Sequence, residues 1–302
     1  RRINSNNMKS LKAGRIISNV VIYIILIIMS ILWVLPIVWL VLQSFSGDGL
    51  ASRSRLIPKT FTFSNYINLL TGSSSSDAVV HALDGKFPIW ILNTLIVSVL
   101  VCLISTVFVL GTAYALSRFR FKGRTMLMKL NLVIGMFPGF LSMIIMYWVM
   151  KEIFHLQGSY WSLVIIYSAG AGGGYYISKG FFDTISKSID EAAMIDGATK
   201  SQIFWQIILP LAKPIVVYTI LTSFMGPWGE YVTSSYIVGL QNIDNWTVAI
   251  GLYKMMSDYQ YSITYYTQFA AGGVCVAIPI TALFLGLQKY YVSGVTGGAV
   301  KG

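Results

Sequence analysis

Six stretches of the chain lack charged residues, and they alternate with segments that carry all of the Lys, Arg, Asp and Glu. These stretches cover residues 16–47, 87–117, 130–150, 156–178, 214–229 and 259–288. A bilayer core of about 30 Å requires roughly 20 apolar residues at a helical rise of about 1.5 Å each. Five stretches reach that length, and the one from Pro214 reaches it if Glu230 is included. The pattern predicts six membrane-spanning helices at roughly 16–43, 88–117, 130–150, 158–178, 214–237 and 264–288.

The composition supports this assignment. The chain of 302 residues is 55% hydrophobic and 11% charged, with a mean hydropathy of +0.68, whereas soluble domains are about 25% charged. The first stretch exceeds the 7–15 apolar residues of a signal peptide, so we expect it to remain as the first span. Cys102 and Cys275 each lie within an apolar stretch and are expected to be small packing residues. We therefore predict an all-α membrane protein.

The net charge of +11 is distributed unevenly between the two sides of this arrangement. Of the 22 Lys and Arg residues, 16 lie before the first span or after the second, fourth and sixth spans. Because an excess of Lys and Arg marks the cytoplasmic side, both termini are expected in the cytoplasm. The positive charge thus indicates topology and does not require nucleic acid as a partner. We predict a cytoplasmic segment at 1–15, one membrane domain over 16–302, a large cytoplasmic loop at 179–213 and a tail at 289–302.

The loop at 179–213 carries the clearest local signals. Ser188–Glu191 and Thr199–Gln202 both have the form of a capping box at a helix start, and Gly197 is of the residue type that ends a helix in the left-handed conformation. The loop should therefore form a helix–turn–helix that presents small side chains, Ala192 and Ala193, and Met194 to the cytoplasm. On pattern alone, a simple surface hairpin joining two spans explains the loop equally well.

Two fixed spacings in this loop are characteristic of a known family. Glu191-Ala-Ala193, followed by Gly197 and then by Ile207–Pro210, resembles the EAA loop of binding-protein-dependent ABC importers. Further stretches resemble the carbohydrate branch of that family, closest to the MalG-type subunits of maltose and maltodextrin importers; they are Phe63–Tyr66, Asn93–Ile96, Ala115–Arg118, Phe121–Arg124 and Gly297–Gly302.

The resemblance implies a permease subunit with the type I ABC importer fold in a bacterial cell membrane. Such a subunit pairs with a second, MalF-like permease, two copies of a cytoplasmic ATPase and an extracellular or periplasmic sugar-binding protein. By this resemblance the chain translocates a maltose- or maltodextrin-like oligosaccharide by alternating access, and the partner ATPase binds ATP and Mg, so that the chain itself holds no cofactor. Another oligosaccharide carried by the same architecture is the alternative.

The resemblance also assigns roles to particular residues. The family's loop docks into the ATPase, which implies coupling roles for Glu191, Ala192, Ala193, Met194, Asp196 and Gly197. The family also inserts a short outer loop into the binding protein, and its position here implies contacts by Ser257, Asp258, Tyr259 and Gln260. The tail Gly297–Gly302 is expected to reach between the ATPase subunits.

The motifs of the principal enzyme classes are absent from the sequence. It contains no phosphate-binding Gly-x-x-x-x-Gly-Lys-[Ser/Thr], no Gly-x-Ser-x-Gly and no His-Glu-x-x-His. Its two histidines, His81 and His155, lie in predicted outer segments and form neither a metal site nor a triad. We therefore expect a non-catalytic subunit. An ion-coupled secondary transporter is a less favoured alternative, because Glu230 is the one ionisable residue inside a predicted span.

Glu230 lies in a segment that should interrupt its helix. Pro227 and two neighbouring glycines disfavour a continuous helix there, and broken helices at membrane depth usually line protein or water. We interpret Trp228, Glu230 and Tyr231 as lining the substrate pathway, because aromatic faces and a few polar groups suit sugar rings. An aromatic belt at the outer membrane boundary, about 22 Å above Pro214, is an equally good interpretation.

Overall fold

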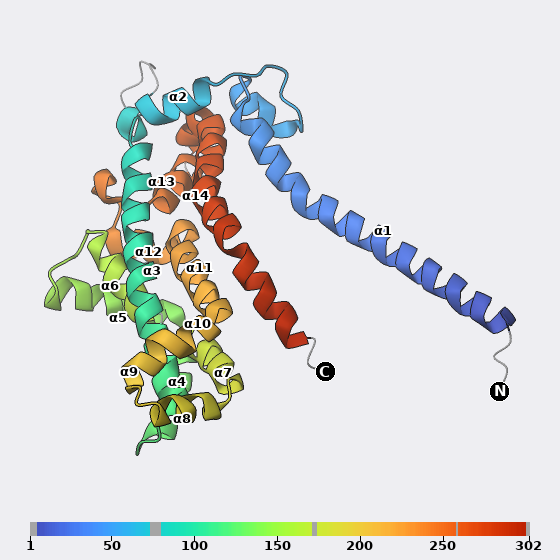
Figure 1. Ribbon diagram of the computed structural model, residues 1–302. Coiled ribbons are helices and arrows are strands. Elements are labelled where there is room, and N and C mark those ends of the chain that lie inside the picture. The colour runs from blue at the N-terminus through green and yellow to red at the C-terminus, as the bar shows by residue number, and fades with distance from the viewer. Residues whose placement is uncertain (1–4, 73–79, 171–173, 258, 300–302) are drawn as a thin grey trace.

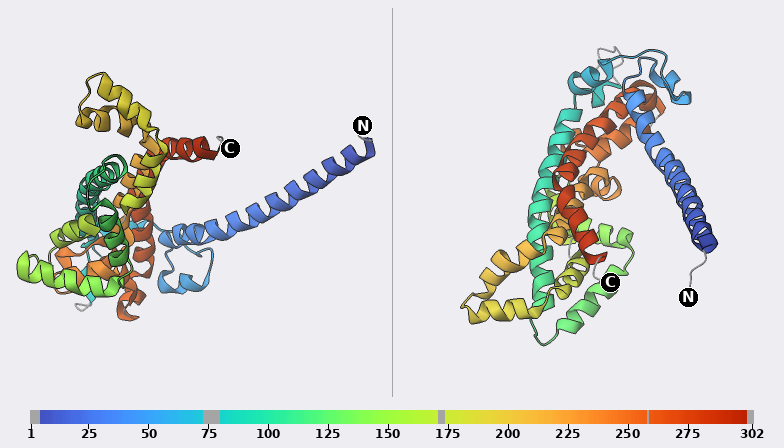
Figure 2. Two further views of the ribbon diagram at one scale, coloured as in Figure 1. Left: turned by 90° about the horizontal axis from the view of Figure 1, so that it is seen from below. Right: turned by 45° about the vertical axis from the view of Figure 1, so that its right-hand side comes forward.

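The apolar stretches become helices that run along the length of an elongated bundle (Figures 1 and 2). The computed structural model describes residues 5–72, 80–170, 174–257 and 259–299. Asp258 and residues 300–302 of the tail therefore lie outside the described residues. Within the described residues, β structure is limited to one antiparallel bridge between Ser46 and Phe61. The prediction of an all-α chain is confirmed for this part.

Three helices are each long and apolar enough to cross a membrane. They are α1 (Ser5–Ser44), α3 (Phe87–Arg118) and α14 (Tyr259–Ala299), and their apolar parts cover Ser18–Ser44, Phe87–Arg118 and Tyr259–Tyr290. The apolar part of α1 is exposed over residues 18–38, and α1 points away from the other helices (Figure 1). Its carboxyl-terminal part contacts α14, where Leu40 lies against Gly273.

The third predicted span is a bent pair of helices. Helix α4 (Arg124–Gly135) meets α5 (Gly139–Trp148) and its continuation Val149–Ile153 at 98°. Pro138 stands between them, has no N–H for a helical hydrogen bond and disfavours helical backbone in the residue before it. The prediction of one continuous helix at 130–150 is therefore wrong. With each bent pair counted as one span, up to five spans are present among the described residues.

The predicted helix at 214–237 is also interrupted. Helix α11 (Lys213–Gly229) ends before Glu230, whose backbone is extended, and α12 (Val232–Val238) follows. The predicted span at 158–178 corresponds to α6 (Trp161–Gly170) and part of α7 (Tyr175–Thr184); residues 171–173 of the glycine-rich stretch between them lie outside the described residues. The expected break in this helix is thus confirmed, but it falls at Glu230, three residues after Pro227.

The long helix α3 organises the bundle, because it packs against α6, α7, α11 and α13 (Val248–Ser257). Two clusters of buried side chains lie along it. One contains Trp90, Val97 and Val101 and the other contains Val109, Ala113 and Tyr114. The first cluster lies toward the end of the molecule that carries the short helices at Gly49–Ser54, α2 (Ser64–Thr71), Val80–Leu83 and Ile243–Asn245, shown at the top of Figure 1; we call it the loop end.

The opposite end of α3 carries the helix–turn–helix, residues 186–212, which we call the hairpin. Its first helix is α8 (Lys187–Ile195), and its second runs over Lys200–Leu211, composed of α9 (Lys200–Gln202), Ile203–Ile208 and α10 (Leu209–Leu211). Gly197 lies between them with a φ of +86°, as the sequence predicts. The second helix meets α11 at 86°.

The two predicted capping boxes have different outcomes. At Thr199 the box is confirmed, because its side chain accepts from the Gln202 N–H and the Gln202 side chain accepts from the Thr199 N–H. At Ser188 the prediction is wrong. Ser186 is the capping residue of α8, and its hydroxyl accepts from the Ser188 N–H at 3.3 Å. Ser188 therefore lies within the first helical turn, two residues after the cap.

Candidate functional site

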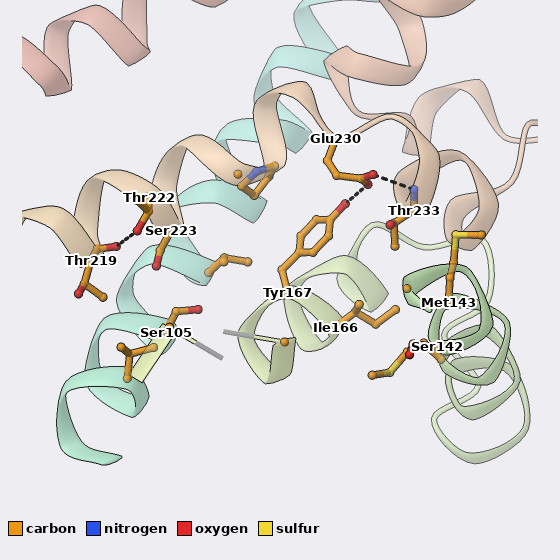
Figure 3. Close-up of a pocket in the computed structure, with 18 of the residues that line it drawn as sticks. Ser105, Ser142, Met143, Ile166, Tyr167, Thr219, Thr222, Ser223, Glu230 and Thr233 are labelled. Carbon is orange, nitrogen blue, oxygen red and sulfur yellow. Dashed lines mark hydrogen bonds between the residues drawn. The ribbon is translucent and has the colours of Figure 1, made fainter. Parts of the chain in front are cut away.

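A cavity of about 560 Å³ lies beside the middle of α3, a size within the range of about 300–1,000 Å³ typical of small-ligand sites. Helices α3, α5, α6, α11 and α12 all contribute to its wall, and Figure 3 shows the side chains that converge on it. Eight of the side chains in its wall carry hydroxyl groups, namely Ser105, Ser142, Tyr167, Tyr218, Thr219, Thr222, Ser223 and Thr233.

Glu230 forms part of this wall at the break between α11 and α12. Its carboxylate accepts the Tyr167 hydroxyl hydrogen at 2.8 Å and the backbone N–H groups of Thr233 and Ser234 at 3.1 Å each (Figure 3). The Tyr167 hydroxyl is also 2.9 Å from the Ser234 hydroxyl. The carboxylate thus satisfies two donors at the start of α12, where a negative charge is favoured. This environment explains how a charged side chain is held within an apolar segment.

The hydroxyl groups differ in how far they are already engaged. Those of Thr219 and Thr222 donate to main-chain carbonyls one turn earlier, at 2.8 and 2.9 Å. The Ser105 hydroxyl is buried and makes no hydrogen bond to another described residue. A buried hydroxyl without a partner costs free energy that a ligand's hydroxyl would recover. Ser105 is therefore a candidate ligand contact.

The electrostatic character of the cavity follows from its charged groups. Among the described residues that line it, Glu230 is the one carboxylate, and none is Lys, Arg or His. Hydroxyl groups donate and accept hydrogen bonds without carrying charge. The arrangement suits a neutral molecule rich in hydroxyl groups, and it provides no cation to pair with an acidic ligand.

The other two residues interpreted as lining the pathway lie elsewhere. Trp228 is 3% exposed and its ring lies 5.8 Å from that of Phe224, inside the core near the loop end. The Tyr231 ring stacks on that of Tyr253 of α13 at a centroid distance of 3.8 Å. Because the chain turns at Glu230, both rings lie between packed helices and do not face the cavity. The structure brings Glu230 alone of these three residues to the cavity wall.

Sequence reasoning missed most of the cavity, although one signal was present. Thr219, Thr222, Ser223 and Gly226 recur at intervals of three and four along α11, so they share one face of that helix. A polar stripe of small residues in an otherwise apolar helix is such a signal. Tyr167 and Ser105 gave no such signal, because their places in the cavity wall are set by the packing of α6 and α3.

At the other candidate site, the hairpin divides its residues between two faces. Ala193 and Asp190 are 8% and 7% exposed, respectively, on the side of α8 that faces α3. The residues that the sequence assigns to ATPase coupling are otherwise exposed; these are Glu191, Ala192, Met194, Asp196 and Gly197. Between α8 and the end of α3 lies a second cavity of about 590 Å³, whose wall includes Glu191, Met194 and Arg120.

Charged side chains join the hairpin to the bundle. The Arg118 Nε lies 3.2 Å from Asp190 Oδ2. Next to it, Asp183 of α7 accepts from the Ser117 hydroxyl and from Lys179 Nζ, both at 2.6 Å. Burial acts to raise the pKa of Asp183, but these two hydrogen bonds, together with the positive charges of Lys179 and Arg124, outweigh it and hold the pKa below its usual value. Asp183 therefore remains ionised at neutral pH and links α3 to α7.

The residues predicted to contact a binding protein lie at the loop end. Ser257 ends α13, and Tyr259 and Gln260 begin α14. All three are exposed, Tyr259 to 78%. The fourth predicted residue, Asp258, lies outside the described residues. This group and the hairpin thus occupy opposite ends of the molecule (Figure 1).

Comparison with known proteins identifies related sequences. Residues 107–297 match the family described as "Binding-protein-dependent transport system inner membrane component". The chain is 37% identical over 297 residues to the galactooligosaccharides transport system permease protein GanQ of Bacillus subtilis, covering 98% of this chain and 100% of that protein. It is 32% identical over 298 residues to the maltodextrin transport system permease protein MalD of Streptococcus pneumoniae, covering 97% and 99% respectively.

A third relative and one solved structure extend the comparison. The maltose/maltodextrin transport system permease protein MalG of Vibrio vulnificus is 33% identical over 281 residues, covering 89% of this chain and 91% of that protein. The solved structure is of a bacterial ABC transporter involved in the import of the acidic polysaccharide alginate. One of its chains superimposes with a TM-score of 0.73 at 23% identity, covering 92% of this chain and 98% of that chain. This similarity shows a shared fold.

Proposed function

We propose that this chain, which belongs to the binding-protein-dependent transport system inner membrane components, carries a neutral oligosaccharide of the maltodextrin type. Within that family, it belongs to the permeases of carbohydrate ABC importers. It is a multi-pass protein of the bacterial cell membrane with a non-catalytic role in transport. The observation that carries the proposal is the cavity beside α3, with eight hydroxyl side chains, one carboxylate and no cation among the described residues of its wall.

The substrate class follows from this lining. A neutral sugar exchanges hydrogen bonds with water for hydrogen bonds with hydroxyl groups, whereas an anionic sugar would face the Glu230 carboxylate. Ser105 and Glu230 line the proposed sugar pathway, and Trp228 and Tyr231 support the broken helix from behind. Maltodextrin-type relatives favour a maltodextrin. A galactooligosaccharide is the second candidate, because it is the substrate printed in the name of a relative at 37% identity.

The proposed topology has six spans with both termini in the cytoplasm. Helices α1, α3 and α14 are three of them, α4 with α5 is the fourth, and α11 with α12 is the fifth. The sixth is formed by α6 and the part of α7 before Lys179, which flank residues 171–173. With this orientation the hairpin lies on the cytoplasmic side and residues 257–260 lie outside.

The proposed machine contains a second, MalF-like permease, two ATPase subunits that bind ATP and Mg, and a sugar-binding protein. The exposed face of α8, formed by Glu191, Ala192 and Met194, docks on an ATPase, and Ser257 to Gln260 contact the binding protein. ATP binding moves the hairpin, and the cavity opens to each side of the membrane in turn. An ion-coupled mechanism is less favoured, because two backbone N–H groups and Tyr167 already engage the Glu230 carboxylate.

Purification of the tagged chain from its native membrane tests this proposal. We expect an ATPase to purify with it, and we expect the ATPase rate to rise when the binding protein is loaded with maltotriose. Galactotriose and an alginate trisaccharide, supplied separately, distinguish the sugar classes. The variant Glu230→Gln should reduce transport, because a neutral amide that also donates hydrogen bonds fits the start of α12 poorly. A chain that purifies without an ATPase would refute the proposed function, and stimulation by the alginate trisaccharide alone would refute the sugar class.

A further inference from the structure

Arg118, the last residue of α3, is a buried charge that the transport proposal leaves without a role. Its side chain is 5% exposed, and a charged group is almost never buried to this extent without partners. The guanidinium contacts two segments at once. Its Nε lies 3.2 Å from Asp190 Oδ2 on α8, and its Nη2 donates to the Ile185 carbonyl at 3.0 Å. Arg118 therefore holds α3 against both the hairpin and the segment that leads into it.

The position of Asp190 on α8 gives this contact its significance. Asp190 is 7% exposed on the face of α8 toward α3, and the next residue, Glu191, is exposed on the face proposed to meet the ATPase. One short helix thus carries both contacts. Because α8 has only nine residues, a displacement of its exposed face must displace Asp190 as well.

The same helix that ends at Arg118 also forms part of the cavity wall. Val101, Ser105 and Val109 of α3 line the cavity. Val109 precedes Arg118 by nine residues, which is about 14 Å along an α-helix. The helix between them is continuous, so a shift at Arg118 reaches the cavity without an intervening hinge.

Apolar packing also joins the hairpin to α3. Tyr114 packs against Phe204 with ring centroids 4.7 Å apart, and Ile203 is buried in the same cluster. Such contacts stabilise the interface but tolerate sliding, whereas a buried ion pair fixes the register of two elements. Arginine suits this position, since its guanidinium lies beside the Asp190 carboxylate and at the same time donates to the Ile185 carbonyl, two groups that a lysine could not span.

From this geometry we propose that Arg118 is the positioning residue through which movement of the ATPase-facing hairpin reaches α3 and the cavity wall. The inference rests on the proposed function and adds the residue pair that performs the coupling. It predicts that the Arg118–Asp190 pair is required for coupling and dispensable for membrane insertion and for recruitment of the ATPase.

Two double variants test whether the pair transmits movement or only holds the hairpin against α3. Arg118→Met with Asp190→Leu replaces the pair by apolar side chains, an exchange that is often neutral for stability at buried sites. Arg118→Asp with Asp190→Arg reverses the pair. Arg120→Met is the matched control, since Arg120, like Arg118, lines the second cavity, between α8 and the end of α3.

The experiment uses the whole complex in lipid nanodiscs, with its binding protein and either maltotriose or galactotriose. For the apolar pair we expect normal recruitment of the ATPase, a basal ATPase rate within about twofold of the unmodified complex, and stimulation by the loaded binding protein reduced about tenfold, within the usual range of allosteric coupling. The reversed pair should recover most of the stimulation, and the Arg120→Met complex should keep all of it.

Three results would overturn the inference. The first is full stimulation in the complex with the apolar pair. The second is a reversed pair that recovers nothing although its ATPase is bound. The third is loss of both double variants from the membrane, because a link that serves coupling alone is not needed for insertion. A failed transport proposal would be recognised separately, since the unmodified chain would then show no ATPase to be stimulated.

Discussion

At the loop end, α3 holds its neighbours through neutral hydrogen bonds to main-chain atoms, beside one exposed ion pair between Lys86 and Asp244. At the hairpin end, it holds them through buried or half-buried charged side chains. Trp90 Nε1 donates to the Ile243 carbonyl at 2.9 Å, and Asn93 Nδ2 donates to the carbonyls of Asp244 and Trp246 at 2.7 and 3.0 Å. At the other end, Arg118 pairs with Asp190 and Ser117 donates to Asp183.

This difference indicates two kinds of attachment. Main-chain groups cannot lose their hydrogen-bonding capacity, so the segment before α13 is fixed under all conditions that keep the fold. Side-chain charges respond to protonation and to the removal of either partner. The loop end is therefore built as a fixed platform, and the hairpin end as an attachment whose strength depends on charge. Since one helix carries both, we expect α3 to relay between them.

The largest effect should come from closing the tightest contact at the loop end. A Cβ added at Gly251 of α13 would lie 2.0 Å from Trp90 Cε3, and the Trp90 ring is fully buried, so α13 would have to move. Overpacking of this kind costs roughly 1–3 kcal/mol. We expect Gly251→Ala to lower the thermal midpoint of the purified complex and to abolish stimulation by the binding protein, while the ATPase stays bound.

Gly111→Ala on α3 provides the control, because its added Cβ meets no other residue within 4 Å. This variant should keep both the thermal midpoint and the stimulation. A Gly251→Ala complex with an unchanged midpoint would show that α13 is not fixed to Trp90, and the contrast between the two ends would fail.

An intermediate effect should follow from cutting the attachments at both ends together. Asn93→Ala leaves two main-chain acceptors without their donor, at a cost of about 1–3 kcal/mol, and Asn93 lies about 38 Å along the helix from Arg118. Changes so far apart should add in the thermal midpoint. In the stimulation of the ATPase, however, Asn93→Ala should cause little further loss once the Arg118–Asp190 pair is apolar. Losses that multiply in that assay would show that the two ends act independently.

The sequence predicted those parts of the fold that depend on local chemistry. Charge-free stretches became helices because a helix satisfies the backbone hydrogen bonds of each segment internally, as apolar surroundings require. Gly197 adopts its predicted φ of +86°, and the Thr199–Gln202 box caps the following helix, because each depends on residues within one helical turn. The first capping box was assigned to the wrong serine because Ser186 and Ser188 are both suitable capping residues.

The parts that sequence reasoning missed depend on contacts between distant segments. Tyr167 meets Glu230 across 63 positions of the chain, and only the packing of α6 against the broken helix brings them together. Trp228 was interpreted as a pathway residue from its neighbour Glu230, yet the turn of the backbone at Glu230 sends the two side chains in different directions. Similarly, Arg118 and Asp190 lie 72 positions apart in the sequence, and only the packing of α8 against α3 brings them together.

The smallest effect concerns pH at the hairpin end. The hydrogen bonds from Lys179 and Ser117 hold the pKa of Asp183 below its usual value although burial opposes them. A carboxyl group with a lowered folded-state pKa stabilises the fold above its unfolded pKa of about 3.9, and this stability is lost as the pH falls through the folded value.

Limited proteolysis of the hairpin in nanodiscs, followed from pH 6 to pH 3, measures this contribution. At pH 6, the unmodified chain should be cut more slowly than Asp183→Asn. As the pH falls through the range in which Asp183 takes up its proton, this difference between the two proteins should shrink. Because Asp183 is partly exposed, solvent screening limits the difference to about 0.5 kcal/mol. Parallel pH profiles for the two proteins would show that Asp183 does not link the hairpin end to α3, and the charged attachment would then rest on Arg118 alone.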